Sequence, residues 1–228
     1  MADYRTEEEQ IEILKTWWRE NGRSTVIGVV VALVGYFGWA AWHSYQQSKM
    51  EAAADLYQQM AVGKDGAPAA DKNKVTAAAE QLRKDYPGSV YAIFAALHLA
   101  KDAVDAKDFP RAAEMLAWAA ERKPDASLAP LVTLRLAQVQ YAQGQHDAAL
   151  ATLTSVKDGG AWKAALEELR GDVLLAQNRP DMARNAYGEA LKALDDSGAQ
   201  ERRQNIEMKL AELAEPVQAV PATTGGKS

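Results

Sequence analysis

Apolar side chains dominate one long stretch near the start of the chain, from Ser24 to Ser48, which contains no Asp, Glu, Lys or Arg. Within it, residues 24–45 would make a helix about 33 Å long, enough to cross a hydrocarbon core of about 30 Å. Valine and glycine are poor formers of soluble helices, but in lipid every backbone group must bond inside its own segment. The pattern predicts one transmembrane helix over 24–45, since no second stretch of this kind follows in the sequence.

The charges on the two sides of this segment predict its orientation. Lys15, Arg19 and Arg23 precede it, whereas only Lys49 and the more distant Lys64 follow it. Basic residues near a membrane span stay on the cytoplasmic side. Residues 1–23 are therefore expected in the cytoplasm, with the remainder of the chain on the other side of the membrane.

A cleaved signal peptide is the alternative interpretation of the same stretch. Val26 to Phe37 would then be its apolar region, and Gly38-Trp39-Ala40 its small-residue cleavage site. The polar, acidic leader and the aromatic Trp42 and Tyr45 beyond the possible cut favour an anchor that is kept, because tryptophan and tyrosine gather at membrane interfaces.

After residue 46 the apolar positions recur at helical spacing, and almost no strand-like alternation occurs. In one such segment Ala112, Leu116 and Ala120 follow Asp108, a residue type that caps helix starts. Residues 46–214 are therefore predicted to form an all-α domain. The Pro-, Thr- and Gly-containing segment 215–228 is predicted to be a disordered tail.

Small residues return at fixed intervals in this domain. Two such sets and one set of turn residues each repeat after 37 and then 34 positions: Ala100, Ala137 and Gly171; Ala112, Ala149 and Ala183; and Lys107, Gly144 and Asn178. The pattern resembles a degenerate tetratricopeptide repeat (TPR), a helical hairpin of about 34 residues that stacks into a solenoid. The predicted fold is a single N-terminal transmembrane helix followed by a short TPR-like helical solenoid.

Charge and residue types exclude several functional classes. Residues 46–228 carry 22 Lys and Arg against 25 Asp and Glu, a net charge of −3, with no basic block, so nucleic acid is not an expected partner. His43, His98 and His146 lack the spacing of a zinc site, and no phosphate loop or nucleophile motif is present. We expect no catalytic residue, no metal, no cofactor and no small-molecule substrate.

The TPR resemblance implies which side chains would line a partner-binding groove on the first helix of each repeat. These positions, with Asp105 beside them, are Phe94, Leu97, Lys101, Leu131, Leu134, Gln138, Tyr141, Glu168, Asp172 and Leu175. An unpaired Lys101, Glu168 or Asp172 is unusual in a core but ordinary in the polar rim of an interface. The alternative is that the leucines pack between repeats and the charged residues are merely solvated.

The predicted membrane helix carries a stripe of small residues. Gly28, Ala32 and Gly35 lie on one side of it, where a second membrane helix could approach closely. Small residues are also frequent in spanning helices that bind nothing.

Several separated motifs resemble the YfgM family of Gram-negative bacteria, in the same order and over nearly the whole chain to about residue 213. They are Glu9-Gln10-Ile11-Glu12, Trp17-Trp18-Arg19-Glu20-Asn21-Gly22, Gly38-Trp39-Ala40-Ala41-Trp42, Leu134-Arg135-Leu136-Ala137 with Gly144 and Asp147, and Glu168-Leu169-Arg170-Gly171-Asp172 with Leu174-Leu175-Ala176. The tail after Pro216 departs from what the family leads us to expect.

This resemblance implies an inner-membrane protein whose TPR-like domain lies in the periplasm. It further implies an ancillary subunit of the SecYEG translocon and a partner of the periplasmic chaperone PpiD, with membrane lipid around the anchor. Its role would be protein–protein interaction during protein translocation, not catalysis. The alternative is a generic TPR adaptor for another inner-membrane assembly.

Overall fold

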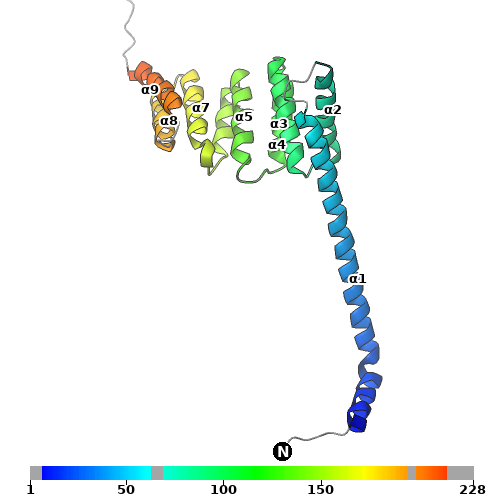
Figure 1. Cartoon of the computed structure of the whole chain (residues 1–228). Helices are drawn as coiled ribbons and strands as arrows, with labels where there is room; N and C mark the ends of the chain where they lie inside the picture. The colour runs from blue at the N-terminus through cyan, green and yellow to red at the C-terminus, as the bar shows by residue number, and fades with distance from the viewer. Residues whose placement is uncertain (1–6, 63–68, 195–198, 215–228) are drawn as a thin grey trace, which may run out of the picture. The chain divides into compact units, whose positions relative to one another are not determined.

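The computed structural model describes residues 7–62, 69–194 and 199–214, and all regular secondary structure in these ranges is helical (Figure 1). The helices are α1 (Glu7–Val62), α2 (Ala69–Asp85), α3 (Val90–Asp105), α4 (Phe109–Glu121), α5 (Ala129–Ala142), α6 (His146–Thr154), the short 3₁₀ helix η1 (Gly160–Trp162), α7 (Lys163–Ala176), α8 (Pro180–Ala193) and α9 (Gln200–Ala214). This confirms the predicted all-α fold. The predicted tail 215–228 lies outside the described residues.

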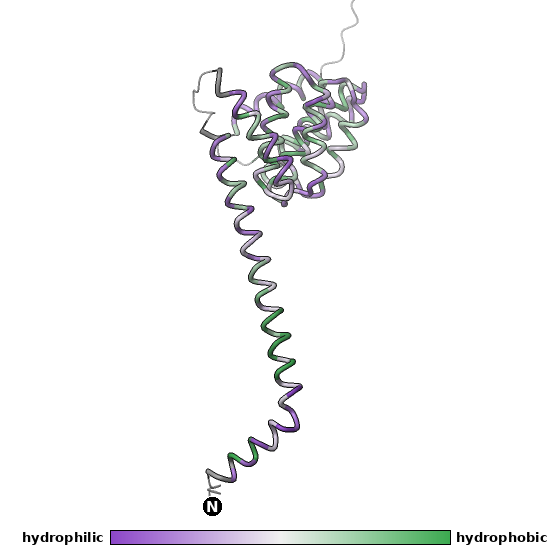
Figure 2. Tube along the Cα trace, turned by 90° about the vertical axis from the view of Figure 1, so that its right-hand side faces the viewer, coloured by the Kyte–Doolittle hydropathy of each residue, from purple (hydrophilic) through white to green (hydrophobic). Residues whose placement is uncertain are grey.

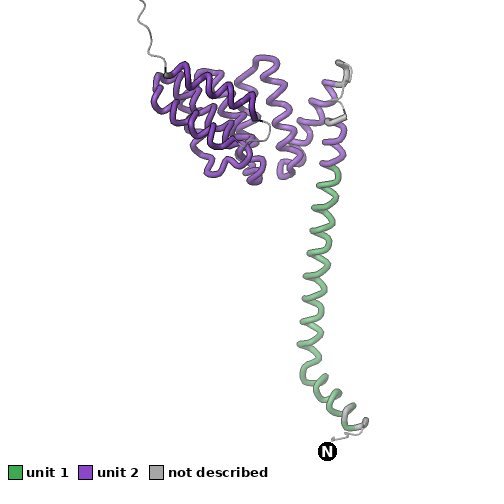
Figure 3. Tube along the Cα trace, turned by 60° about the vertical axis from the view of Figure 1, so that its left-hand side comes forward, with its two compact units in different colours: residues 1–52 green, residues 53–228 purple. Residues whose placement is uncertain are grey.

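The chain forms two units, residues 1–52 and 53–228 (Figure 3). The first consists mainly of the N-terminal part of α1, and Figure 2 shows its central stretch as strongly apolar. Large apolar side chains stand exposed there, with Val31 66% and Phe37 64% accessible. Among the described helices, α1 alone is long and apolar enough to cross a membrane, and the predicted segment 24–45 lies within it.

The second unit contains the three predicted hairpins, α3–α4, α5–α6 and α7–α8. The two sets of small residues that recur at the 37- and 34-residue intervals are buried. In the second helix of each hairpin, Ala112, Ala149 and Ala183 are fully inaccessible to solvent. A small side chain at this place lets the two helices of a hairpin approach closely, which is why the repeat shows in the sequence.

The turns inside the hairpins also follow the predicted register. Lys107, Gly144 and Asn178 have φ angles of 60°, 73° and 58°, so each reverses the chain through the left-handed region. The Asp108 side chain then accepts a hydrogen bond from the backbone N–H of Arg111 and caps α4, as its sequence position predicts.

Helices outside the repeats cover both ends of the array. At the N-terminal end, Met60 of α1 and Leu82 of α2 are buried in one apolar cluster with Leu99 of α3. At the other end, Ile206 of α9 is fully buried against α8, in a cluster that includes Tyr187. These terminal helices shield apolar surfaces that the end repeats would otherwise expose.

One contact fixes the last hairpin closely. Tyr187 of α8 is fully buried, and its ring lies against the backbone of α7 at Gly171. A Cβ atom at position 171 would stand 2.4 Å from the ring, so only glycine leaves room for the tyrosine.

Candidate protein-binding face on helices α3, α5 and α7

The first helices of the three hairpins present equivalent side chains. Residues 37 and then 34 positions apart form three such sets: Leu97, Leu134 and Glu168; Lys101, Gln138 and Asp172; and Val104, Tyr141 and Leu175. We call these surfaces together the first-helix face. Its middle set changes from a cation on α3 through a neutral amide on α5 to a carboxylate on α7, and after this set we call the two ends of the face its basic end and its acidic end.

A cleft of about 470 Å³ on this face lies between α3 and α5, and we call it the α3–α5 cleft. Helix α4 packs against both helices, whereas α3 and α5 do not pack closely together, unlike α5 and α7. Helix α4 has 13 residues and α6 has 9, which contributes to the longer first repeat interval. The lining side chains are Leu97, Ala100, Lys101, Val104, Phe109, Leu116, Leu131, Arg135, Gln138, Val139 and Ala142.

A smaller opening of about 250 Å³ lies between α5 and α7, and α9 contributes to its lining. Four predicted site residues line it: Leu134, Gln138, Glu168 and Asp172. Leu134 is only 3% exposed and belongs to the core between α5 and α7. The structure therefore gives Leu134 a packing role and leaves little of its side chain for a partner.

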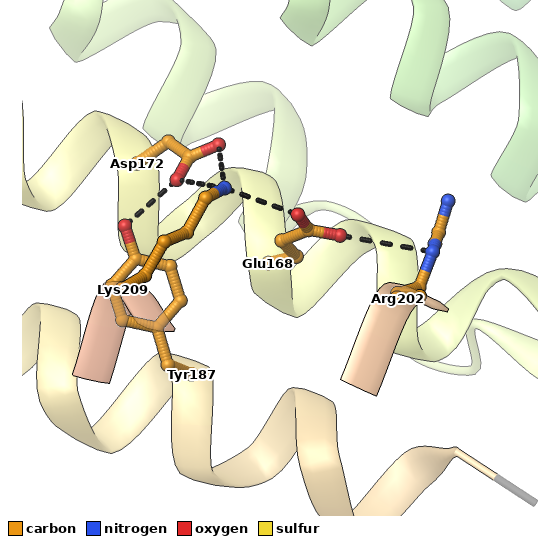
Figure 4. A network of polar contacts seen from close by, with 5 residues as sticks. All are labelled: Glu168, Asp172, Tyr187, Arg202 and Lys209. Atoms are coloured by element: carbon orange, nitrogen blue, oxygen red, sulfur yellow. Dashed lines mark hydrogen bonds and ion pairs between the residues drawn. The ribbon is translucent and has the colours of Figure 1, made fainter. Parts of the chain in front are cut away.

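The acidic end of the face is already engaged by α9 (Figure 4). Lys209 Nζ donates hydrogen bonds to both carboxylate oxygens of Asp172, at 2.7 and 3.0 Å, and to Glu168 Oε1 at 3.0 Å. The Tyr187 hydroxyl donates to Asp172 at 2.7 Å, and Arg202 lies 3.8 Å from Glu168. The sequence interpretation assumed that Glu168 and Asp172 are unpaired, and this is wrong. Both are paired with side chains of α9, a helix about 40 residues later in the chain.

The electrostatics of this network hold it in one protonation state. Burial opposes the charge on Lys209, but its hydrogen bonds to Asp172 and Glu168 outweigh burial and raise the pKa of the ammonium. Burial, together with the hydrogen bond to Asp172, raises the pKa of Tyr187 well above its ordinary value. Lys209 therefore stays charged and Tyr187 neutral near pH 7, and the stabilisation from Lys209 is lost only as the pH rises above about 10.

The basic end of the face also contains an ion pair. Lys101 Nζ lies 2.6 Å from Asp105, and this hydrogen bond raises the pKa of the lysine. The assumption that Lys101 is unpaired is wrong as well. Both side chains are more than half exposed, so the pair lies in solvent and is easily exchanged for a partner's charge.

The two predicted aromatic anchors make contacts inside the domain. The Phe94 ring lies 5.8 Å from that of Tyr57, and the Tyr141 ring lies 5.6 Å from that of His146. Both are half-buried. Their removal would disturb packing, so they are poor positions for a binding test.

Seven lining side chains of the α3–α5 cleft were not selected from the sequence, among them Val104 and Arg135 at its edge. Val104 is 37% exposed although it is apolar, and Arg135 is exposed at the rim. The repeat register contained the signal for Val104, because it is equivalent to Tyr141 and Leu175. Arg135 is equivalent to His98 and Leu169, and the repeat register does not mark these positions as part of a binding face.

The remaining predicted features concern metals and the membrane helix. Within the described ranges, no group of three or more His, Cys, Asp or Glu residues is placed to hold a metal ion. A Cβ atom added at Gly28 or Gly35 would meet no atom within 4 Å, so packing around these positions in the structure does not require glycine.

Comparisons with known proteins agree with the repeat architecture. The model of a tetratricopeptide repeat-like domain family matches residues 15–215. No solved structure matches the chain.

Curated relatives match almost end to end. The chain is 36% identical to the ancillary SecYEG translocon subunit of Aggregatibacter actinomycetemcomitans, over 91% of this chain and 97% of that protein. It is 33% identical to the protein of that name in Haemophilus influenzae over the same shares, and 34% identical to the one in Escherichia coli, over 85% of this chain and 91% of that protein. The chain belongs to this family, the YfgM family of ancillary SecYEG translocon subunits with a tetratricopeptide repeat-like domain.

Proposed function

We propose that this protein is an inner-membrane scaffold that associates with the SecYEG translocon and with the chaperone PpiD, and assists the handling of translocated proteins. The observation that carries the proposal is similarity over about nine tenths of the chain to relatives named as ancillary SecYEG translocon subunits. The PpiD component rests on the family resemblance and is the finer part of the proposal.

The structure supports a binding role for the second unit. An array of helical hairpins offers one extended face for a partner's helix or peptide, and the α3–α5 cleft leaves part of that face open. A domain tethered in the membrane beside a pore works at high local concentration, so weak contacts suffice. This arrangement suits a non-catalytic adaptor.

The proposed topology places residues 1–23 in the cytoplasm, 24–45 in the inner membrane and 46–214 in the periplasm. The exposed apolar surface of α1 supports the membrane segment, since large apolar side chains exposed over so many turns need a lipid environment. The excess of basic residues before the segment supports the orientation.

Purification of the full chain in a mild detergent, with quantitative mass spectrometry, tests the proposed association. SecY, SecE, SecG and PpiD should be enriched over a single-pass membrane protein produced at the same level. Enrichment of another inner-membrane assembly in their place would establish the generic adaptor and reject the proposal.

The same purification tests the proposed packing role of the small-residue stripe. Gly28→Leu and Gly35→Leu together should lower recovery of a membrane partner if a helix packs there, while membrane insertion persists. Ala41→Leu, on the opposite side of α1, is the matched control. Unchanged recovery in the double variant would leave the stripe without a packing role.

A further inference from the structure

We propose that the α3–α5 cleft binds a short segment of a partner protein in which apolar side chains stand next to a carboxylate. The inference rests on the proposed scaffold function and adds to it the place and the chemistry of docking. It does not depend on which protein carries the segment.

The floor and walls of the cleft are mainly apolar. Side chains from α3, α4 and α5 meet there, including Leu97, Phe109 and Leu131. Val104 remains 37% exposed at the edge of the cleft; of its two equivalents, Leu175 is 40% exposed and Tyr141 is half-buried. A volume of about 470 Å³ is within the range of small-ligand pockets and holds a few partner side chains.

The charge of the cleft selects among apolar partners. Its lining contains Lys101 and Arg135 and no carboxylate. Asp105 balances Lys101, whereas the contact shown for the Arg135 guanidinium is a 3.0 Å hydrogen bond from Nη1 to the neutral side-chain oxygen of Gln138. An arginine fork binds carboxylates with two parallel hydrogen bonds, so an acidic group in the partner fits this rim.

The acidic end of the first-helix face also shows charge complementarity, with the signs reversed. There Glu168 and Asp172 are matched by Lys209 of α9, a helix that also buries Ile206. The chain thus places two basic side chains of α9, Lys209 and Arg202, on its acidic surface, while an apolar side chain of the same helix is buried beside them. The α3–α5 cleft has the opposite charge, so its complementary occupant is an acidic, amphipathic segment.

Selectivity in this arrangement comes from charge and most of the affinity from apolar burial. A solvent-exposed ion pair adds little binding strength, but it penalises a partner of the wrong sign. We therefore expect modest affinity and a clear preference for acidic over basic segments.

Peptide binding to the full chain in neutral-lipid nanodiscs tests this preference. The probes are a fluorescently labelled peptide of alternating leucine and glutamate, and the same peptide with lysine in place of glutamate; empty nanodiscs are the blank. The acidic peptide should bind more tightly to the wild type. Arg135→Glu should weaken its binding by about fivefold and strengthen that of the basic peptide.

A matched pair of substitutions locates the binding place. Val104→Asp should weaken the acidic peptide by about fivefold or more, because it puts a carboxylate at the edge of the apolar cleft. Leu175→Asp changes the equivalent residue of α7, which is 40% exposed, and should leave binding within about twofold. Unchanged thermal unfolding of each variant shows that the fold is intact. If Val104→Asp alters thermal unfolding, Val104→Ser takes its place.

Three outcomes would overturn the inference. The first is equal binding of the acidic and basic peptides. The second is an equal loss of affinity for the acidic peptide in Val104→Asp and Leu175→Asp. The third is occupation of the cleft by a second copy of the chain or by its residues 215–228, which would be seen as competition with the peptide. None of these measurements involves SecYEG. A failure here with intact copurification rejects the docking chemistry alone, whereas lost copurification with intact peptide binding rejects the proposed function alone.

Discussion

Replacing Gly171 by alanine is expected to destabilise the helical domain by about 2 kcal/mol. The new Cβ would lie 2.4 Å from the ring of Tyr187, which is fully buried and held by its hydrogen bond to Asp172 at 2.7 Å. Overpacking of this kind costs about 3 kcal/mol at the upper end of its usual range, and the better helix propensity of alanine returns about 1. Thermal or urea unfolding measures the difference.

Gly188 supplies the matched control, since it also lies within a helix of the last hairpin but a Cβ there meets nothing within 4 Å. Gly188→Ala should raise stability by up to about 1 kcal/mol. Opposite signs for the two substitutions would confirm the α7–α8 contact. Equal stabilisation by both would show that Tyr187 does not lie against Gly171.

The second large effect concerns topology, and it is expected to be all or none. Alkaline phosphatase, which is active only outside the cytoplasm, should be active when joined after residue 214 and inactive when joined before residue 1. The physical reason is that Lys15, Arg19 and Arg23 hold the leader inside while the 24–45 segment remains in lipid. Alkaline phosphatase assays on cells that produce each fusion give the measurement.

Mass spectrometry of the purified chain is the companion control, and it should find the leader retained. A mature N-terminus at Ala41 would show that the apolar stretch is a cleaved signal peptide. An active phosphatase at the N-terminal junction would reverse the proposed orientation.

The sequence predicted the parts of this fold that depend on local patterns. Ala112, Ala149 and Ala183 mark close helix approaches, and such positions must stay small in every repeat. Lys107 and Asn178 stand in left-handed turns that occur at the same register as Gly144. These constraints recur along the chain, so a single sequence reveals them.

Side-chain partners across long sequence separations were beyond that reasoning. Lys209 reaches Asp172 only because α9 packs beside the last hairpin, and the repeat pattern of the sequence does not predict this ion pair. The same holds for Phe94, whose ring meets Tyr57 of α1. The predicted binding face therefore separates into packed residues, residues engaged by α9, and an open cleft that only the three-dimensional arrangement of α3, α4 and α5 reveals.

Site-specific photocrosslinking in intact cells tests the central claim, that the first-helix face holds a partner at the translocon, most directly. A photoreactive side chain at Val104 lies at the α3–α5 cleft, and one at Glu114 lies on the exposed surface of α4. We expect crosslinks from position 104 to a SecYEG component or to PpiD, and few from position 114. Crosslinks to those proteins from position 114, and none from position 104, would contradict it.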